Sequence, residues 1–273
     1  MSKKIGILLM LLAMAALISS CMMAVYDYPG VGPPVERFQR SGAFASAATL
    51  SLRNFDGNIE IQGWGEEQVE VYAEKLILLP DRTRVYLWSS DWQKWTPRIE
   101  YEKSDDFVRI NTKSPNQEGK DCVVDYFVSV PHSVNLKDII ARDGDVVIRD
   151  LYGAVFIDLR AGNLNVDNVS GSLTAMVAEG SIQAALYDLR EMDQINLTTR
   201  RGDITLLLEA DVNARFEGSA PKGELFLEFE TGTSEDKGRV STRLGSGEGA
   251  SIIVTALEGD IRIRMIDEVT KKR

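Results

Sequence analysis

Glycines spaced nine residues apart divide the middle of the chain into short units of alternating hydrophobicity. In each unit the second and fourth residues after the glycine are apolar. Alternation with a period of two predicts strands that bury one face. The uninterrupted run consists of Gly144, Gly153, Gly162, Gly171 and Gly180.

The same frame recurs outside this run, after Gly57, Gly202, Gly223 and Gly259. All eighteen frame positions of these nine glycines are apolar. An Asn, Asp or Ser often follows the glycine, and such pairs are typical of tight turns, because glycine adopts positive φ and a short polar side chain bonds to the turn backbone. We therefore interpret all nine as structural turn glycines at the starts of strands.

A nine-residue unit accommodates one strand and one corner, so two strands fit into eighteen residues. One unit alone leaves its apolar face exposed, whereas stacked units bury their faces in a common core. The pattern predicts an all-β protein, a β-solenoid or β-helix-like stack of short strands that follows an N-terminal β region. A β-sandwich is the alternative architecture.

Phrases in which Gly-Asp precedes an apolar residue resemble the repeat of a bacterial adhesin-like family, known as domain-of-unknown-function family 4097. They occur at Gly144, Gly202 and Gly259, and residues 54–64 resemble the opening hairpin of that family. The resemblance covers about residues 44–266. It implies a β-solenoid-like body and an adhesin-like role, and it implies no catalytic residues.

The first residues have the organisation of a signal peptide, with basic Lys3 and Lys4, an apolar stretch over residues 5–17 and small residues before a cysteine. The sequence Ile-Ser-Ser-Cys ending at Cys21 resembles the lipobox of bacterial lipoproteins. The resemblance implies cleavage between Ser20 and Cys21 and the attachment of lipid, such as palmitate, to Cys21. Two or more acyl chains hold a protein firmly on a membrane.

An uncleaved transmembrane anchor is the alternative, because the apolar sequence from residue 5 to residue 25 is nearly long enough to span a bilayer. Both interpretations place the body of the protein outside the cytoplasm, since the lysines stay on the cytoplasmic side. Met22 stands where an aspartate would resemble an inner-membrane retention signal, so we expect the outer membrane in a diderm cell.

These features predict five segments. They are a signal peptide (1–20), a lipidated flexible tether (21–43), an N-terminal β region with a Trp-rich hairpin (44–130), the β-solenoid (131–266) and a polar C-terminal tail (267–273).

The formal net charge is −10, and removal of Lys3 and Lys4 with the signal peptide makes the remaining chain more acidic. Nucleic-acid binding needs a local excess of Lys and Arg, which this composition does not offer. We therefore expect no nucleic-acid partner. The expected partners are the membrane, through the lipid anchor, and an envelope protein or glycan.

Three tryptophans close together in the sequence are the residues we consider for ligand contact. Trp88, Trp92 and Trp95 surround a turn, and tryptophan at a loop tip can stack on a sugar ring. The competing interpretation is a hairpin that covers one end of the core, as an open solenoid requires.

The sequence offers little catalytic chemistry. His132 is the only histidine and follows Pro131, which favours a turn residue over a triad or a metal ligand. Cys122 lies in an apolar strand pattern and fits a small buried side chain. Asp143, Asp145 and the aspartates at 203 and 260 could form an acidic ladder, but the spacing of a calcium repeat is missing. We predict no catalytic residue, no metal and no cofactor.

The sequence therefore predicts a lipid-anchored cell-envelope protein that acts as a non-enzymatic, adhesin-like binding or interaction module. One alternative is a carbohydrate-active β-helix enzyme, a glycan hydrolase or lyase that would use two of the many carboxylates. The other is a structural or signalling partner in envelope-stress sensing.

Overall fold

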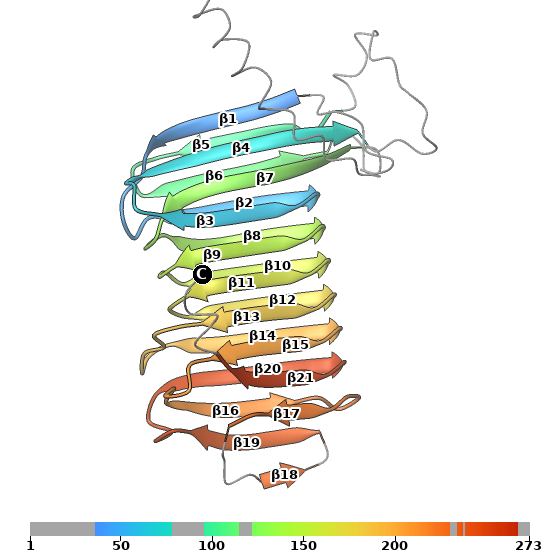
Figure 1. Ribbon diagram of the computed structural model, residues 1–273. Coiled ribbons are helices and arrows are strands. Elements are labelled where there is room, and N and C mark those ends of the chain that lie inside the picture. Colours follow the sequence, from blue (N-terminus) through green and yellow to red (C-terminus); the bar gives the residue numbers. More distant parts are fainter. Residues whose placement is uncertain (1–35, 78–95, 115–121, 230–233, 237, 267–273) are drawn as a thin grey trace, which may run out of the picture.

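The computed structural model describes residues 36–77, 96–114, 122–229, 234–236 and 238–266, and within them it contains twenty-one strands in two sheets (Figure 1). The all-β prediction is confirmed. No helix suited to crossing a bilayer occurs in the described part of the chain.

The ten-stranded sheet consists, in spatial order, of β1 (Glu36–Ala43), β4 (Gln68–Ile77), β7 (Cys122–Pro131), β3 (Ile59–Trp64), β9 (Val146–Leu151), β11 (Leu164–Val169), β13 (Ile182–Leu186), β15 (Ile204–Leu208), β21 (Ile261–Met265) and β17 (Leu225–Leu227). The eleven-stranded sheet consists of β18 (Ser234–Asp236), β19 (Arg239–Leu244), β16 (Ala214–Ser219), β20 (Ala250–Glu258), β14 (Gln194–Arg201), β12 (Leu173–Glu179), β10 (Val155–Ala161), β8 (Asn135–Asp143), β2 (Thr49–Asp56), β6 (Phe107–Lys113) and β5 (Arg98–Lys103).

Each coil of the central stack contributes one strand to each sheet, and successive coils pair in parallel. For example, β8 and β9 form one coil, and β10 and β11 form the next, with Val146 opposite Leu164 and Ala141 opposite Leu159. This coil-by-coil parallel pairing makes the molecule a β-solenoid-like stack, so the solenoid prediction is confirmed over the sandwich alternative.

The core lies between the two sheets and is made by the frame residues that the sequence pattern singles out. Sixteen of the eighteen frame residues are buried. The exceptions are Leu225 and Leu227 on β17, which are only partly buried and pack against the core from the last strand of the ten-stranded sheet. The predicted buried face is therefore correct except where the stack ends.

The turn glycines form a column in which each coil rests on the coil before it. Gly162 and Gly180 have φ of 127° and 140°. A Cβ on Gly180 would lie 1.8 Å from the Gly162 carbonyl oxygen, far inside van der Waals contact. Only glycine permits this approach. The column contains Gly57, Gly144, Gly162, Gly180, Gly202, Gly259 and Gly223.

Two of the predicted turn glycines differ from the expected conformation, because Gly153 and Gly223 do not have positive φ. They are required for space instead, since a Cβ on Gly153 would lie 2.2 Å from the Val134 carbonyl oxygen. Gly171 has a φ of 110° and packs on Gly153, because a Cβ on Gly171 would lie 3.2 Å from the Gly153 carbonyl oxygen.

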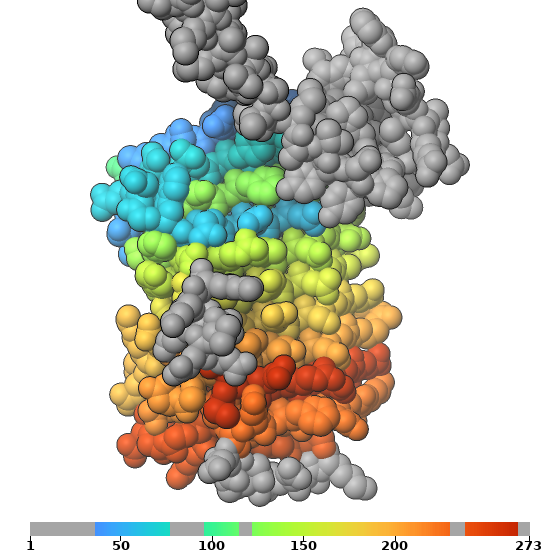
Figure 2. Space-filling view, in the orientation of Figure 1, coloured from blue at the N-terminus to red at the C-terminus, as the bar shows by residue number. Residues whose placement is uncertain are grey.

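The order of strands in space differs from their order in the chain at both ends of the stack. The coil of β2 and β3 lies between β6 and β7 on one side and β8 and β9 on the other. The coil of β20 and β21 lies between two coils that precede it in the chain, the coil of β14 and β15 on one side and that of β16 and β17 on the other. Its red band lies between orange ones in Figure 2. The coil of β2 and β3 and the coil of β20 and β21 are therefore each covered on both sides by other strands.

Two of the predicted segment boundaries need correction. Residues 36–43, expected in the tether, form strand β1, which pairs antiparallel with β4. Residues 44–130 and 131–266 share both sheets, because β2 pairs with β8 and β3 pairs with β9. The N-terminal β region is thus one end of the same stack.

Replacing a column glycine should destabilise the protein strongly. Gly180→Ala forces a Cβ against the Gly162 carbonyl and a positive φ onto alanine, and we expect a loss of about 2–4 kcal/mol in the free energy of unfolding. Gly65→Ala is the matched control, because a Cβ there meets nothing within 4 Å. Urea denaturation measures both, and equal stabilities of the two variants would contradict the packing of the column.

Candidate functional site

The residues predicted for lipid attachment and ligand contact lie outside the described residues. They are Ser20, Cys21, Trp88, Trp92 and Trp95. Their roles therefore stay predictions. The other residues considered for chemistry lie within the stack.

His132 and Cys122 occupy structural positions. The His132 Nδ1 lies 2.8 Å from the Asp150 carbonyl oxygen, and its ring stacks on Tyr152 with centroids 5.0 Å apart. Cys122 is buried at the start of β7. Among the described residues no group of three or more His, Cys, Asp or Glu side chains is arranged to hold a metal ion.

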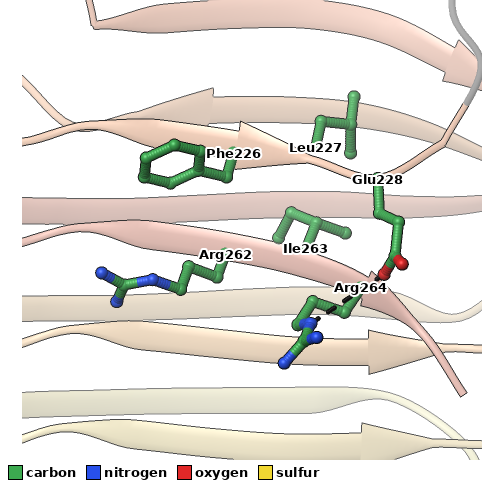
Figure 3. A pocket seen from close by; sticks show the side chains of 6 residues that line it. All are labelled: Phe226, Leu227, Glu228, Arg262, Ile263 and Arg264. Carbon is green, nitrogen blue, oxygen red and sulfur yellow. Dashed lines mark ion pairs between the residues drawn. The ribbon is translucent and has the colours of Figure 1, made fainter.

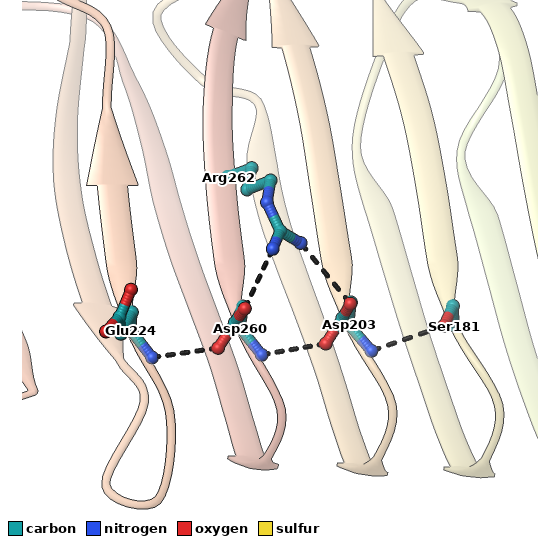
Figure 4. A network of polar contacts seen from close by, with 5 residues as sticks. All are labelled: Ser181, Asp203, Glu224, Asp260 and Arg262. Carbon is teal, nitrogen blue, oxygen red and sulfur yellow. Dashed lines mark hydrogen bonds and ion pairs between the residues drawn. The ribbon is translucent and has the colours of Figure 1, made fainter.

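A ladder of short polar side chains runs beside the glycine column. From Asn58 to Asp260, the residue after each turn glycine accepts a hydrogen bond from the backbone N–H of the equivalent residue in the next coil. At the two ends, Asp125, which does not follow a glycine, accepts from the Asn58 N–H, and Glu224 donates its N–H to Asp260. For example, Asp203 Oδ1 accepts from the Asp260 N–H at 2.9 Å, and Asp260 Oδ1 accepts from the Glu224 N–H at 3.0 Å (Figure 4). The ladder runs through Asp125, Asn58, Asp145, Asn163, Ser181, Asp203, Asp260 and Glu224.

The ladder accounts for three of the four aspartates considered for calcium. A carboxylate oxygen of each of these three residues accepts a hydrogen bond from a backbone N–H: Asp145, Asp203 and Asp260. Turn N–H groups otherwise left without a partner are costly when removed from water. The carboxylates therefore stabilise the corner of the stack.

Arg262 projects from β21 and joins two steps of the ladder. Its guanidinium lies 2.8 Å from Asp260 Oδ2 and 3.3 Å from Asp203 Oδ2 (Figure 4). The Arg262 side chain is 39% exposed, so these ion pairs contribute little stability. Their effect is to hold the guanidinium in one orientation.

Beside Arg262 the outer surface of the ten-stranded sheet is hollowed into a shallow depression of about 230 Å³ (Figure 3). The Phe226 side chain is 49% exposed at its rim, and the Arg262 guanidinium carbon lies 5.8 Å from the centre of the ring. Glu228 and Arg264 face each other at 3.9 Å. The lining residues are Phe226, Leu227, Glu228, Arg262, Ile263 and Arg264.

This arrangement suits recognition of a polar ligand. An exposed aromatic ring offers a stacking surface, and a fixed guanidinium offers several hydrogen-bond donors. The neighbouring carboxylates are already engaged by Arg262, Arg264 or backbone N–H groups. The depression is therefore a candidate binding site.

Sequence reasoning missed this depression because it attended to the inward positions of the frame. The third residue after each column glycine points outward, and in this position stand Phe226 after Gly223 and Arg262 after Gly259. An inspection of these outward positions, strand by strand, would have found both residues.

The fold and this surface define the class as a β-solenoid-like protein with a candidate binding face. The family model described as Toastrack DUF4097 matches residues 98–264, and the chain belongs to this family. A search of curated proteins finds no match.

Solved structures with a similar chain trace have low sequence identity. A candidate cell adhesion protein from Clostridium sporogenes is 14% identical, with 85% of this chain and all of that chain covered and a TM-score of 0.49. A candidate adhesin from Bacteroides fragilis is 12% identical, with 86% and 99% covered and a TM-score of 0.28. A candidate lipid binding protein from Parabacteroides distasonis is 10% identical, with 85% and 98% covered and a TM-score of 0.21.

Asp125, at the other end of the ladder, carries a perturbed carboxyl group. Burial raises its pKa above the usual value, the hydrogen bond from the Asn58 N–H partly offsets this, and nearby Glu74 raises it further. Because the pKa of Asp125 is higher in the folded state than in the unfolded state, folding is coupled to proton uptake at pH values between these two pKa values. This carboxyl therefore favours folding more as the pH falls through its folded-state pKa.

Asp125→Asn should raise the melting temperature at neutral pH, since the amide oxygen can still accept the Asn58 N–H and carries no charge. The gain should shrink as the pH falls to about 3.9, the ordinary aspartate pKa, because the Asp125 carboxyl is then protonated in the folded protein. Thermal unfolding at both pH values tests this, with the exposed Asp167→Asn as the control. A lower melting temperature for Asp125→Asn at neutral pH would contradict it.

Proposed function

We propose that this chain is a lipid-anchored cell-envelope protein that acts as a non-enzymatic, adhesin-like binding module outside the cytoplasm. The signal-peptide pattern ending at Cys21 supports the anchor. Membership of the DUF4097 family and the regular outer faces of the stack support a binding role.

The observation that carries the proposal is the pairing of an exposed aromatic ring with a fixed guanidinium. Phe226 is half-exposed on β17, and Arg262 on β21 is held beside it by Asp203 and Asp260. The two ion pairs restrict the guanidinium before a ligand binds, so less conformational entropy is lost there on binding.

The chemistry of the same place favours binding over turnover. A glycan hydrolase needs one carboxyl group that donates a proton and another that attacks or activates water. Beside the depression, Asp260 and Asp203 are bonded to Arg262 and to backbone N–H groups, and Glu228 faces Arg264. These carboxylates fix the shape of the surface.

Phe226→Ala should lower the affinity of the full-length, detergent-solubilised protein for its envelope ligand about tenfold, the usual effect of removing an aromatic anchor. The binding of the protein to immobilised envelope polysaccharides and envelope proteins measures this. Met192→Ala is the control, because Met192 is 86% exposed on a different part of the surface.

Equal binding by Phe226→Ala and the wild-type protein would contradict the proposed site. Release of reducing sugar from a polysaccharide, abolished by the replacement of two carboxylates, would contradict the non-enzymatic role.

Cys21→Ala should abolish labelling with palmitate and release the protein from the membrane fraction, because the thioether that holds the lipid cannot form. Ser20→Ala keeps a small residue before the cysteine and serves as the control. Membrane retention of Cys21→Ala without label would favour the uncleaved transmembrane anchor.

A further inference from the structure

The depression at Phe226 is one end of a row of nine outward side chains that crosses the ten-stranded sheet from β17 to β4, and exposed Gln39 of β1 stands opposite its last residue, Tyr72. One residue from each strand stands opposite its neighbour in the strand register. From end to end the row contains Tyr72, Phe127, Glu60, Val147, Asn165, Gln183, Thr205, Arg262 and Phe226.

Neighbouring strands lie about 4.8 Å apart, so the nine side chains of the row extend over roughly 38 Å. Two of its strands lie out of chain order, because β3 lies between β7 and β9 and β21 lies between β15 and β17. The glycine column and the polar ladder keep the coils in register beneath it.

The chemistry of the row changes from its ends to its middle. Aromatic rings stand at both ends, where Phe127 is 46% exposed with its ring centre 6.2 Å from that of Tyr72, and Phe226 is 49% exposed. Glu60, next to Phe127, is ion-paired with Arg149. The four following residues, on successive strands, are uncharged: Val147, Asn165, Gln183 and Thr205.

Amide and hydroxyl groups donate and accept hydrogen bonds at once, as sugar hydroxyls do, and aromatic rings stack on the apolar faces of sugars. The spacing of about 4.8 Å between strands is close to the length of one sugar ring. An extended glycan lying along the row would therefore place successive sugars at successive strands.

We propose that this row binds a linear, neutral glycan that lies along the stack, across the strands. The inference rests on the proposed binding function and adds the chemical class and the direction of the ligand. Sugars stack at Phe127 and at Phe226, and the middle of the glycan forms hydrogen bonds with Asn165, Gln183 and Thr205.

The charge of the surface selects against an anionic polymer. The chain has a net charge of −10, which repels a polyanion at long range. Within the row, Glu60 is ion-paired with Arg149, and Arg262 with Asp203 and Asp260, so these groups offer no unpaired charge to an ionic polymer. An extended peptide would instead pair with the exposed edge of a sheet, where backbone groups are available, and not with the side chains on its face.

The test is a length series of neutral oligosaccharides, derived from chitin and from cellulose, from the disaccharide to the octasaccharide. Isothermal titration measures their binding to the full-length, detergent-solubilised protein. We expect affinity to rise with length until the row is filled, because each added sugar meets a further strand.

A double variant in the middle of the row separates this inference from the proposed function. Asn165→Ala with Gln183→Ala should weaken octasaccharide binding about tenfold, as expected for two lost hydrogen bonds. Disaccharide binding at Phe226 should not change. The matched control is Asn196→Ala with Thr198→Ala, on the outer face of the eleven-stranded sheet, and thermal unfolding checks the fold of both.

Affinity independent of length, with Phe226 still required, would overturn the row and leave the proposed binding function standing. Binding of no neutral oligosaccharide, or tighter binding of a polyuronate of equal length, would also overturn it. Loss of all binding by the control double variant would place the ligand on the other sheet and contradict the inference.

Discussion

The close approach of successive coils at the glycine column is the constraint on which the rest of the structure depends. The turn of each coil rests on a carbonyl oxygen of the coil before it, as Gly202 rests on Gly180 and Gly180 on Gly162. No side chain fits there. Because each contact fixes the position of one coil relative to the next, the strands of both sheets stay in parallel register over the length of the stack. The polar ladder beside the column satisfies the backbone N–H groups that the tight turns leave over.

Regular stacking has a consequence for the outer surface as well as for the core. Inward residues of successive coils meet in layers, and outward residues stand in rows at the strand spacing. A row that begins near Tyr72 and ends at Phe226 is built in this way, although its residues come from separate parts of the chain. The interleaved coils at the two ends extend the row. At one end β21 and β17 continue it beyond β15, and at the other end β3 and β7 continue it beyond β9.

The periodic part of this structure could be predicted from the sequence. Alternation after each glycine identified the buried face, and Val146, Leu164 and Ile182 lie in the core as expected. The interleaving could not be predicted, since the repeat after Gly259 looks the same whether its coil is last or next to last in space. The positive φ expected at Gly153 and Gly223 was wrong because close packing alone also requires glycine. The site at Phe226 was missed because outward residues carry no periodic hydrophobic signal.

The proposed glycan lies across the strands on the outer face of the ten-stranded sheet. The most direct measurement is nuclear magnetic resonance of the side-chain amide groups during titration with a neutral hexasaccharide. The signals of Asn165 and Gln183 should shift together, while that of Asn196 on the other sheet should not. Shifts at Asn196 with none at Asn165 and Gln183 would contradict it.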